Sequence, residues 1–197
     1  FSIETLKQLT QTPHTLKLDN AVVDIVSKNR AFLERKLAEP NARYYGINTG
    51  FGALCDVKIS NENIEQLQEN LVMSHACGMG DEVKPEVAKL MLLLKIKGLS
   101  LGSSGVCVET IQKLVDFYNA DVIPLIWEVG SLGASGDLAP LAHMSLPLLG
   151  MGEVRYKGER MKTADALKQA NIQSIKLHSK EGLALLNGTQ FMSAWGS

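Results

Sequence analysis

The sequence predicts a mainly helical fold with small β elements. Apolar residues recur at helical spacing in several segments, glycine-rich stretches interrupt that rhythm, and one short segment alternates as a hairpin does. The hydrophobic fraction of 45% over 197 residues suits a buried core. We therefore expect packed helices joined by ordered loops, in one large domain or two small ones.

The first strong helix signal lies near the N-terminus. Asp19 can cap a helix whose apolar positions recur from Val22 to Leu37, and Pro40 lies just beyond its end. Residues 41–55 then contain three glycines, which is long for a simple connection. A loop of this kind is often functional, although a surface excursion is the ordinary interpretation.

Three further helices are predicted before residue 120. Ser60 opens one that ends near Gly78, and Pro85 suits the first turn of the next. That next helix, 87–101, is apolar almost all round and should lie inside the core. The segment 108–119 has an apolar stripe typical of a helix packed on one face.

The C-terminal third combines loops with shorter elements. A glycine loop, 130–137, is followed by a short apolar segment. Residues 153–162 alternate around Lys157-Gly158, which predicts a hairpin. Thr163 should cap a short helix, and Ser179 should open a last one that reaches Gln190.

Composition excludes several classes of function. The 20 basic and 21 acidic residues give a net charge of −1, which offers no electrostatic case for binding nucleic acid or an anionic membrane. The longest apolar run, Leu90 to Leu94, is too short to span a bilayer, and the first 15 residues lack a secretory signal. Three widely spaced cysteines favour reduced thiols in the cytoplasm, and the four scattered histidines give no metal-site spacing. The chain does not begin with Met, so we expect a processed or missing N-terminus.

The glycine loop 130–137 is the leading candidate for chemistry. No Gly-Lys-Ser/Thr follows it, as a phosphate-binding loop requires, and its glycine spacing is not that of a dinucleotide-binding turn. Asp137 stands where a nucleophile elbow needs its last glycine. Two interpretations remain balanced on local grounds: a tight turn, or backbone chemistry on Ala134-Ser135-Gly136.

Three other sites have ordinary interpretations when taken singly. Tyr45 alone would be a half-buried aromatic residue. His75 alone would be a hydrogen-bonded residue at a helix end, and Asn187 alone could cap a helix C-terminus. The glycosylation pattern Asn187-Gly188-Thr189 is best explained as coincidence.

Four motifs taken together resemble the aromatic amino-acid ammonia-lyases. They are Tyr45-Gly46-Ile47-Asn48-Thr49-Gly50-Phe51-Gly52, Ser74-His75-Ala76-Cys77-Gly78, Gly133-Ala134-Ser135-Gly136-Asp137-Leu138-Ala139-Pro140-Leu141-Ala142-His143 and Leu185-Leu186-Asn187-Gly188-Thr189-Gln190. Their order and intervals match that family from about the first helix to the final residue. Chance agreement of four separated motifs is negligible.

The resemblance implies a prosthetic group made by the chain itself. In this family the amide nitrogen of Gly136 would attack the carbonyl carbon of Ala134, and loss of two waters would convert Ser135 into a dehydrated residue bearing a methylidene group. The product is a 4-methylidene-imidazol-5-one ring, with no external cofactor and no metal. Asp137 could assist proton removal during the dehydration.

The resemblance also assigns roles to the other motifs. The ring captures the substrate amine, and Tyr45 removes a β-proton, which requires positive neighbours or hydrogen bonds that favour the phenolate. Ser74 and His75 read the substrate, and Asn187 hydrogen-bonds near the ring. Relatives that act on tyrosine carry His-Leu at the Ser74-His75 position, and those that act on phenylalanine carry Phe-Leu. The polar pair here suits an imidazole, so histidine is the favoured substrate, with trans-urocanate and ammonia as products.

The resemblance further implies the fumarase/aspartase-like multihelical lyase fold and a homotetramer with shared sites. Residues 1–197 would form the N-terminal lyase domain. The helical region that supplies further site residues would be absent, so the chain alone should have little activity. The segment Lys95-Ile96-Lys97-Gly98-Leu99-Ser100-Leu101 departs from the family's Asn-Ser-Leu-(Ala/Ser)-Arg pattern. The core helix thus lacks the family's Asn and Arg, which places local packing or assembly in doubt. The alternatives are a tyrosine or phenylalanine lyase, an aminomutase, or a non-catalytic assembly or binding module.

Overall fold

The computed structural model describes residues 2–12, 14–39, 43–50, 59, 63–130 and 136–197. Helices dominate these residues, as the sequence predicts. The α-helices are α1 (Ile3–Gln11), α2 (Asn20–Leu37), α3 (Ile64–His75), α4 (Pro85–Leu99), α5 (Val108–Asn119), α6 (Leu138–Ser145), α7 (Thr163–Ala170), α8 (Glu181–Leu186) and α9 (Gln190–Trp195), with a 3-10 helix η3 (Leu146–Leu149). The strands are β1 (Met79–Glu82), β2 (Ile123–Pro124), β3 (Trp127–Val129), β4 (Glu153–Tyr156) and β5 (Glu159–Lys162).

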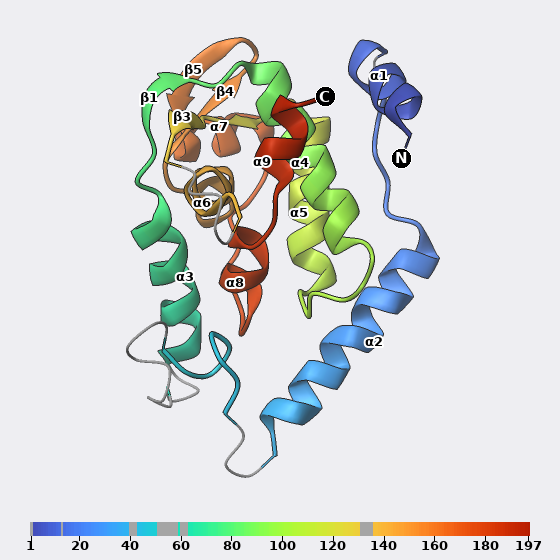
Figure 1. The fold of residues 1–197 in the computed structure, drawn as a ribbon, viewed down its shortest axis with the longest axis vertical. Coiled ribbons are helices and arrows are strands. Elements are labelled where there is room, and N and C mark those ends of the chain that lie inside the picture. Colours follow the sequence, from blue (N-terminus) through green and yellow to red (C-terminus); the bar gives the residue numbers. More distant parts are fainter. Residues whose placement is uncertain (1, 13, 40–42, 51–58, 60–62, 131–135) are drawn as a thin grey trace.

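The core is organised around α4 and α6. Helix α4 is buried on nearly all sides and packs against α5 and α9, and Figure 1 shows these three helices together. Helix α6 contacts α3, α8 and α9, as well as strands β2 and β3. Because α6 begins directly after the glycine loop, the end of that loop is anchored in the centre of the molecule.

The strands form two small antiparallel sheets. Strand β1 pairs with β3, with Met79 opposite Val129, and the second sheet has the order β2-β4-β5. The predicted hairpin is confirmed as β4–β5. Its turn residues Lys157 and Gly158 both have positive φ, at 52° and 83°, as a tight hairpin turn requires.

Most of the helix signals are confirmed. The predicted helix 108–119 has the same first and last residues as α5, and Pro85 is the first residue of α4. The Asp19 carboxylate accepts a hydrogen bond from the amide of Ala21 at 2.8 Å and so caps α2. Helix α3 ends at His75, while its predicted start, Ser60, lies outside the described residues.

Other predictions need correction. The last predicted helix is two helices, α8 and α9, because Gly188 adopts a φ of +149° that no helix accommodates. Helix α8 starts at Glu181 and not at Ser179. Thr163 is the first helical residue of α7, and the capping position belongs to Lys162. Helix α1 and strands β1, β2 and β3 were not predicted. Within the described ranges, every helix is too short or too polar to cross a bilayer.

Candidate active site

Tyr45 lies on a loop that holds its own shape. The Asn48 side chain accepts a hydrogen bond from the amide of Tyr44 at 2.7 Å, and the Thr49 hydroxyl accepts one from the amide of Gly46 at 3.3 Å. Both Asn48 and Thr49 are buried, whereas Tyr45 is 58% exposed. The polar residues of the motif therefore fold the loop, and the phenol stands on its outer side.

Gln68 ties this loop to the rest of the site. Its side chain on α3 is fully buried, donates to the carbonyl of Gly46 at 3.3 Å, and accepts from the amide of Leu183 on α8 at 3.3 Å. Gln68 is not among the predicted site residues, because a glutamine within a helical pattern looks like any other polar position. One buried amide group thus joins the Tyr45 loop, α3 and α8.

Ser74 and His75 occupy the last turn of α3, as predicted. The His75 ring lies with Nδ1 2.8 Å from the carbonyl oxygen of Leu71. Since a carbonyl can only accept, Nδ1 carries the proton in this contact, and Nε2 of the neutral ring is then an acceptor. The Ser74 hydroxyl donates to the same carbonyl at 3.1 Å and lies 3.2 Å from Nδ1.

His143 fixes the chain that leaves α3. Its Nε2 accepts a hydrogen bond from the amide of Gly78 at 3.0 Å, and its ring meets the edge of Trp127. Burial lowers the pKa of the His143 imidazole, which favours the neutral form that this acceptor role needs. The end of α3 is thereby held to α6, the helix that follows the glycine loop.

The glycine loop meets the Asn187-Gly188 turn directly. The amide of Asp137 donates to the carbonyl of Gly188 at 2.9 Å, and an Asp137 carboxylate oxygen accepts from the amide of Met192 at 3.0 Å. Gly136 has a φ of +104°, and a Cβ there would lie 2.5 Å from the Gly188 carbonyl oxygen. Ala134 and Ser135 lie outside the described residues.

Asn187 is exposed, but its main-chain carbonyl group points into the protein. The main-chain oxygen accepts a hydrogen bond of 3.0 Å from Nζ of Lys95 on α4. Burial lowers the pKa of the Lys95 ammonium to about 7. Lys95 is not among the predicted site residues, although a lysine inside an apolar helix was the available signal.

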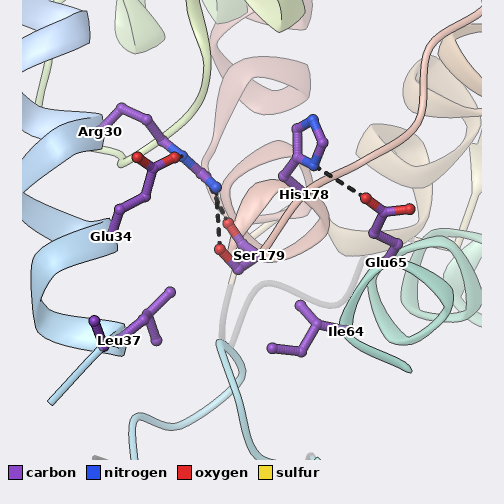
Figure 2. Close-up of a pocket in the computed structure, with 8 residues that line it drawn as sticks. Arg30, Glu34, Leu37, Ile64, Glu65, His178 and Ser179 are labelled. Atoms are coloured by element: carbon purple, nitrogen blue, oxygen red, sulfur yellow. Dashed lines mark hydrogen bonds and ion pairs between the residues drawn. The ribbon is translucent and has the colours of Figure 1, made fainter. Parts of the chain in front are cut away.

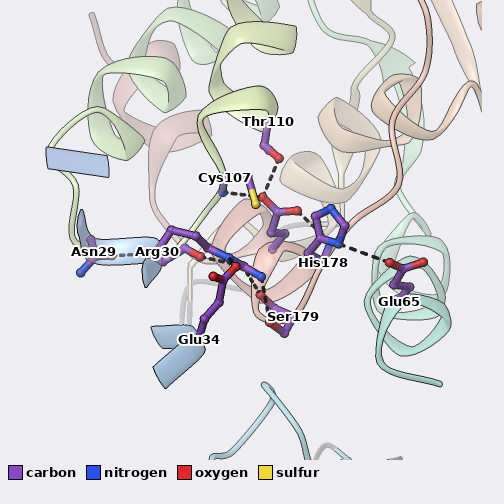
Figure 3. A network of polar contacts seen from close by, with 10 residues as sticks. Asn29, Arg30, Glu34, Glu65, Cys107, Thr110, His178 and Ser179 are labelled. Carbon is purple, nitrogen blue, oxygen red and sulfur yellow. Dashed lines mark hydrogen bonds and ion pairs between the residues drawn. The ribbon is translucent and has the colours of Figure 1, made fainter. Parts of the chain in front are cut away.

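A network of polar contacts around Cys107, Thr110, His178 and Ser179 holds the start of α8 in place (Figure 3). The Glu181 carboxylate is fully buried and accepts from the amides of Cys107 and His178, both at 2.8 Å, and from the Thr110 hydroxyl. Arg30 of α2 donates to the carbonyl of Ser179 at 2.9 Å. Burial, with Glu181 close by, raises the pKa of the Cys107 thiol to about 11, so this thiol is unreactive near neutral pH.

A cavity of about 320 Å³ lies beside that network and away from the predicted site. Arg30 and Glu34 come from α2, Glu65 from α3, and His178 and Ser179 precede α8 (Figure 2). It contains none of the predicted site residues. Across the part of the chain that the structure describes, no group of three or more His, Cys, Asp or Glu residues could hold a metal ion.

Comparison with known proteins bears on this site. The chain matches the family model described as aromatic amino acid lyase over residues 1–197. It is 47% identical to a histidine ammonia-lyase of Pseudomonas fluorescens over 195 residues, covering 99% of this chain and 38% of that protein. The chain thus spans less than two fifths of the length of that relative.

Solved structures of similar proteins agree with the match to the aromatic amino acid lyase family model. A histidine ammonia-lyase from Trypanosoma cruzi aligns with a TM-score of 0.86 and 35% identity, covering 98% of this chain and 37% of the other. The phenylalanine aminomutase of Pantoea agglomerans aligns with a TM-score of 0.91 and 32% identity, covering 100% of this chain and 37% of the other. The fold, the four motifs and these matches agree: the chain belongs to the aromatic amino acid lyase family.

Proposed function

We propose that the whole protein is a histidine ammonia-lyase that converts L-histidine into trans-urocanate and ammonia. The observation that carries the proposal is the contact between the Asp137 amide and the Gly188 carbonyl, 2.9 Å long. It joins the segment bearing Ala134-Ser135-Gly136 to the segment bearing Asn187, two stretches about 50 residues apart in the sequence. The chain's 47% identity to a protein named histidine ammonia-lyase supports the choice of reaction.

The backbone at Gly136 fits a ring closed from Ala134-Ser135-Gly136. Its φ of +104° and its approach to the Gly188 carbonyl both require a residue without a side chain. Glycine also has the least hindered amide nitrogen for attack on the Ala134 carbonyl carbon. A ring closed from these three residues would supply an electrophilic methylidene carbon, whose chemistry would make the substrate amine a better leaving group.

Tyr45 is the proposed base for the β-proton. Its exposed phenol stands on a loop that is fixed by Asn48, Thr49 and Gln68. The main chain of Tyr45 is therefore held in one position while its side chain is accessible to solvent. General-base catalysis by a positioned side chain contributes about 10²- to 10⁴-fold to rate. Gly46, with a φ of +66°, lets the loop turn directly after Tyr45.

The Ser74-His75 pair supports histidine over the alternative substrates. With Nδ1 donating to the Leu71 carbonyl, His75 can offer Nε2 to the N–H of a substrate imidazole. The Asn187 side chain is exposed beside the turn and is the proposed hydrogen-bond partner near the ring and substrate. A phenyl substrate would leave these polar groups unpaired, which disfavours it.

The whole protein is further proposed to be a cytoplasmic homotetramer. Helix α2 exposes Ile25 and Phe32, at 50% and 52%, which supports burial of this helix in a homotetramer whose subunits share sites. Residues 1–197 would be the N-terminal lyase domain of that subunit, and further chain would complete the site. Free thiols at Cys77 and Cys107 support a cytoplasmic location.

Two measurements on the whole protein test the proposal. Intact-mass analysis should find the loss of two waters, localised by peptide mapping to residues 134–136, and histidine should yield urocanate. Ring formation with activity on tyrosine or phenylalanine instead would support a sister lyase or an aminomutase. A protein that shows no loss of mass at residues 134–136 and acts on none of these amino acids would support the non-catalytic module.

A further inference from the structure

Lys95 is a core residue with an unusual side chain for its place. It is 2% exposed, in the middle of a helix that is otherwise apolar on its buried sides. Among the described residues no ion pair includes it, and Nζ has the Asn187 carbonyl as its acceptor at 3.0 Å. Burying an amine without a carboxylate is costly, so an apolar residue would pack here at lower cost.

The carbonyl that Lys95 holds belongs to the Asn187-Gly188 turn. The next carbonyl along the chain, that of Gly188, accepts the Asp137 amide at 2.9 Å. The same oxygen limits the space at Gly136, where an added Cβ would lie 2.5 Å away. Lys95 and Asp137, the residue after Gly136, thus donate hydrogen bonds to adjacent carbonyl groups of a single turn.

The hydrogen bond survives a change in the protonation state of the amine. Burial lowers the pKa of Lys95 to about 7, so both forms are populated near neutral pH. An ammonium and a neutral amine both have N–H groups to donate. The contact with the Asn187 carbonyl is therefore available on either side of that pKa.

We propose that Lys95 is a positioning residue that holds the Asn187-Gly188 turn in the place needed for ring closure at Gly136 and for substrate contact by Asn187. This rests on the proposed function. Lys95 would act through the main chain of the turn, whose Asn187 carbonyl its amine holds. A side chain from another helix is suited to this task, because α8 has ended and α9 has not begun at these residues.

The test compares Lys95→Met with Lys97→Met in the whole protein. Met keeps most of the length of the side chain and removes the donor, while Lys97 is an exposed lysine two residues along the same helix. Lys95→Met should fold, and either the fraction of chains that have lost two waters or the turnover number should fall at least tenfold, with KM changed much less. Lys97→Met should match the wild type in all three.

Lys95→Gln, which retains an N–H donor on a side chain shorter than that of lysine, should give dehydration and turnover between those of Lys95→Met and the wild type. Wild-type dehydration and turnover in a folded Lys95→Met overturns the inference. Loss of folding in both Lys95 variants also overturns it, because Lys95 would then support the fold and not the turn. A wild-type protein that keeps both waters would instead refute the proposed function, so the two failures are distinguishable.

Discussion

The predicted site residues and the buried polar residues near them differ in exposure and in the contacts that their side chains make. Tyr45, Ser74 and Asn187 have exposed side chains. Four buried polar side chains instead bond to main-chain atoms of segments distant in the sequence: Gln68, Lys95, Asp137 and Glu181. The exposed set remains accessible to a ligand or to further chain, while the buried set fixes where the backbone of the site lies.

This difference predicts that the two sets fail differently when mutated. Changes among the exposed residues should alter turnover with little effect on folding, because few native contacts are lost. Changes at the buried residues Gln68, Asp137 and Glu181 should lower the free energy of unfolding, because they leave buried main-chain groups without partners.

The largest effect is expected for Glu181→Ala. It leaves three donors without their buried acceptor, on Cys107, Thr110 and His178, and should lower the free energy of unfolding by about 3–5 kcal/mol. Urea unfolding measures this. Glu65→Ala is the control, since Glu65 makes an exposed ion pair with His178 and should change stability by about 0.5 kcal/mol or less. Equal losses of stability in Glu181→Ala and Glu65→Ala would contradict the distinction between buried and exposed polar residues.

Tyr45→Phe tests the exposed set. Removing the phenolic oxygen should lower turnover about 100-fold or more, while the free energy of unfolding changes by about 0.5 kcal/mol or less. Steady-state urocanate formation and urea unfolding measure the two quantities. The neighbouring substitution Tyr44→Phe is the control and should leave turnover within about twofold. Wild-type turnover in Tyr45→Phe would remove Tyr45 from the role of base.

The smallest effect is expected for Gly98→Ala in α4. A Cβ there would lie 3.6 Å from Nε2 of Gln190, an ordinary contact, so the better helix propensity of alanine should add about 0.5–1 kcal/mol to stability. Thermal unfolding measures it as a rise in Tm. At Gly182 of α8 the same change would place a Cβ 2.6 Å from the Gln68 carbonyl oxygen and should destabilise by about 1–3 kcal/mol. Stabilisation at Gly182 would refute the tight packing of α8 on α3.

Parts of the candidate site were readable from the sequence and parts were not. The motifs around Tyr45, His75, Gly136 and Asn187 were found through their joint resemblance to the aromatic amino-acid ammonia-lyases, and their catalytic roles stay predictions. Gln68 was missed because nothing in its own segment distinguishes a buried glutamine from an exposed one.

The sequence by itself determined the family and part of the local structure. The Asp19 cap, Pro85 at the start of α4, the bounds of α5 and the Lys157-Gly158 turn all follow from interactions within a few residues, which the local sequence specifies completely.

Only the tertiary structure decided which polar side chains hold the site. The pairing of β1 with β3, the division of the last helix at Gly188 and the contact of Lys95 with Asn187 join segments separated by tens of residues. Each depends on which atoms meet after the chain has packed. A lysine in an apolar helix has no local partner, and its acceptor lies 92 positions further along the chain.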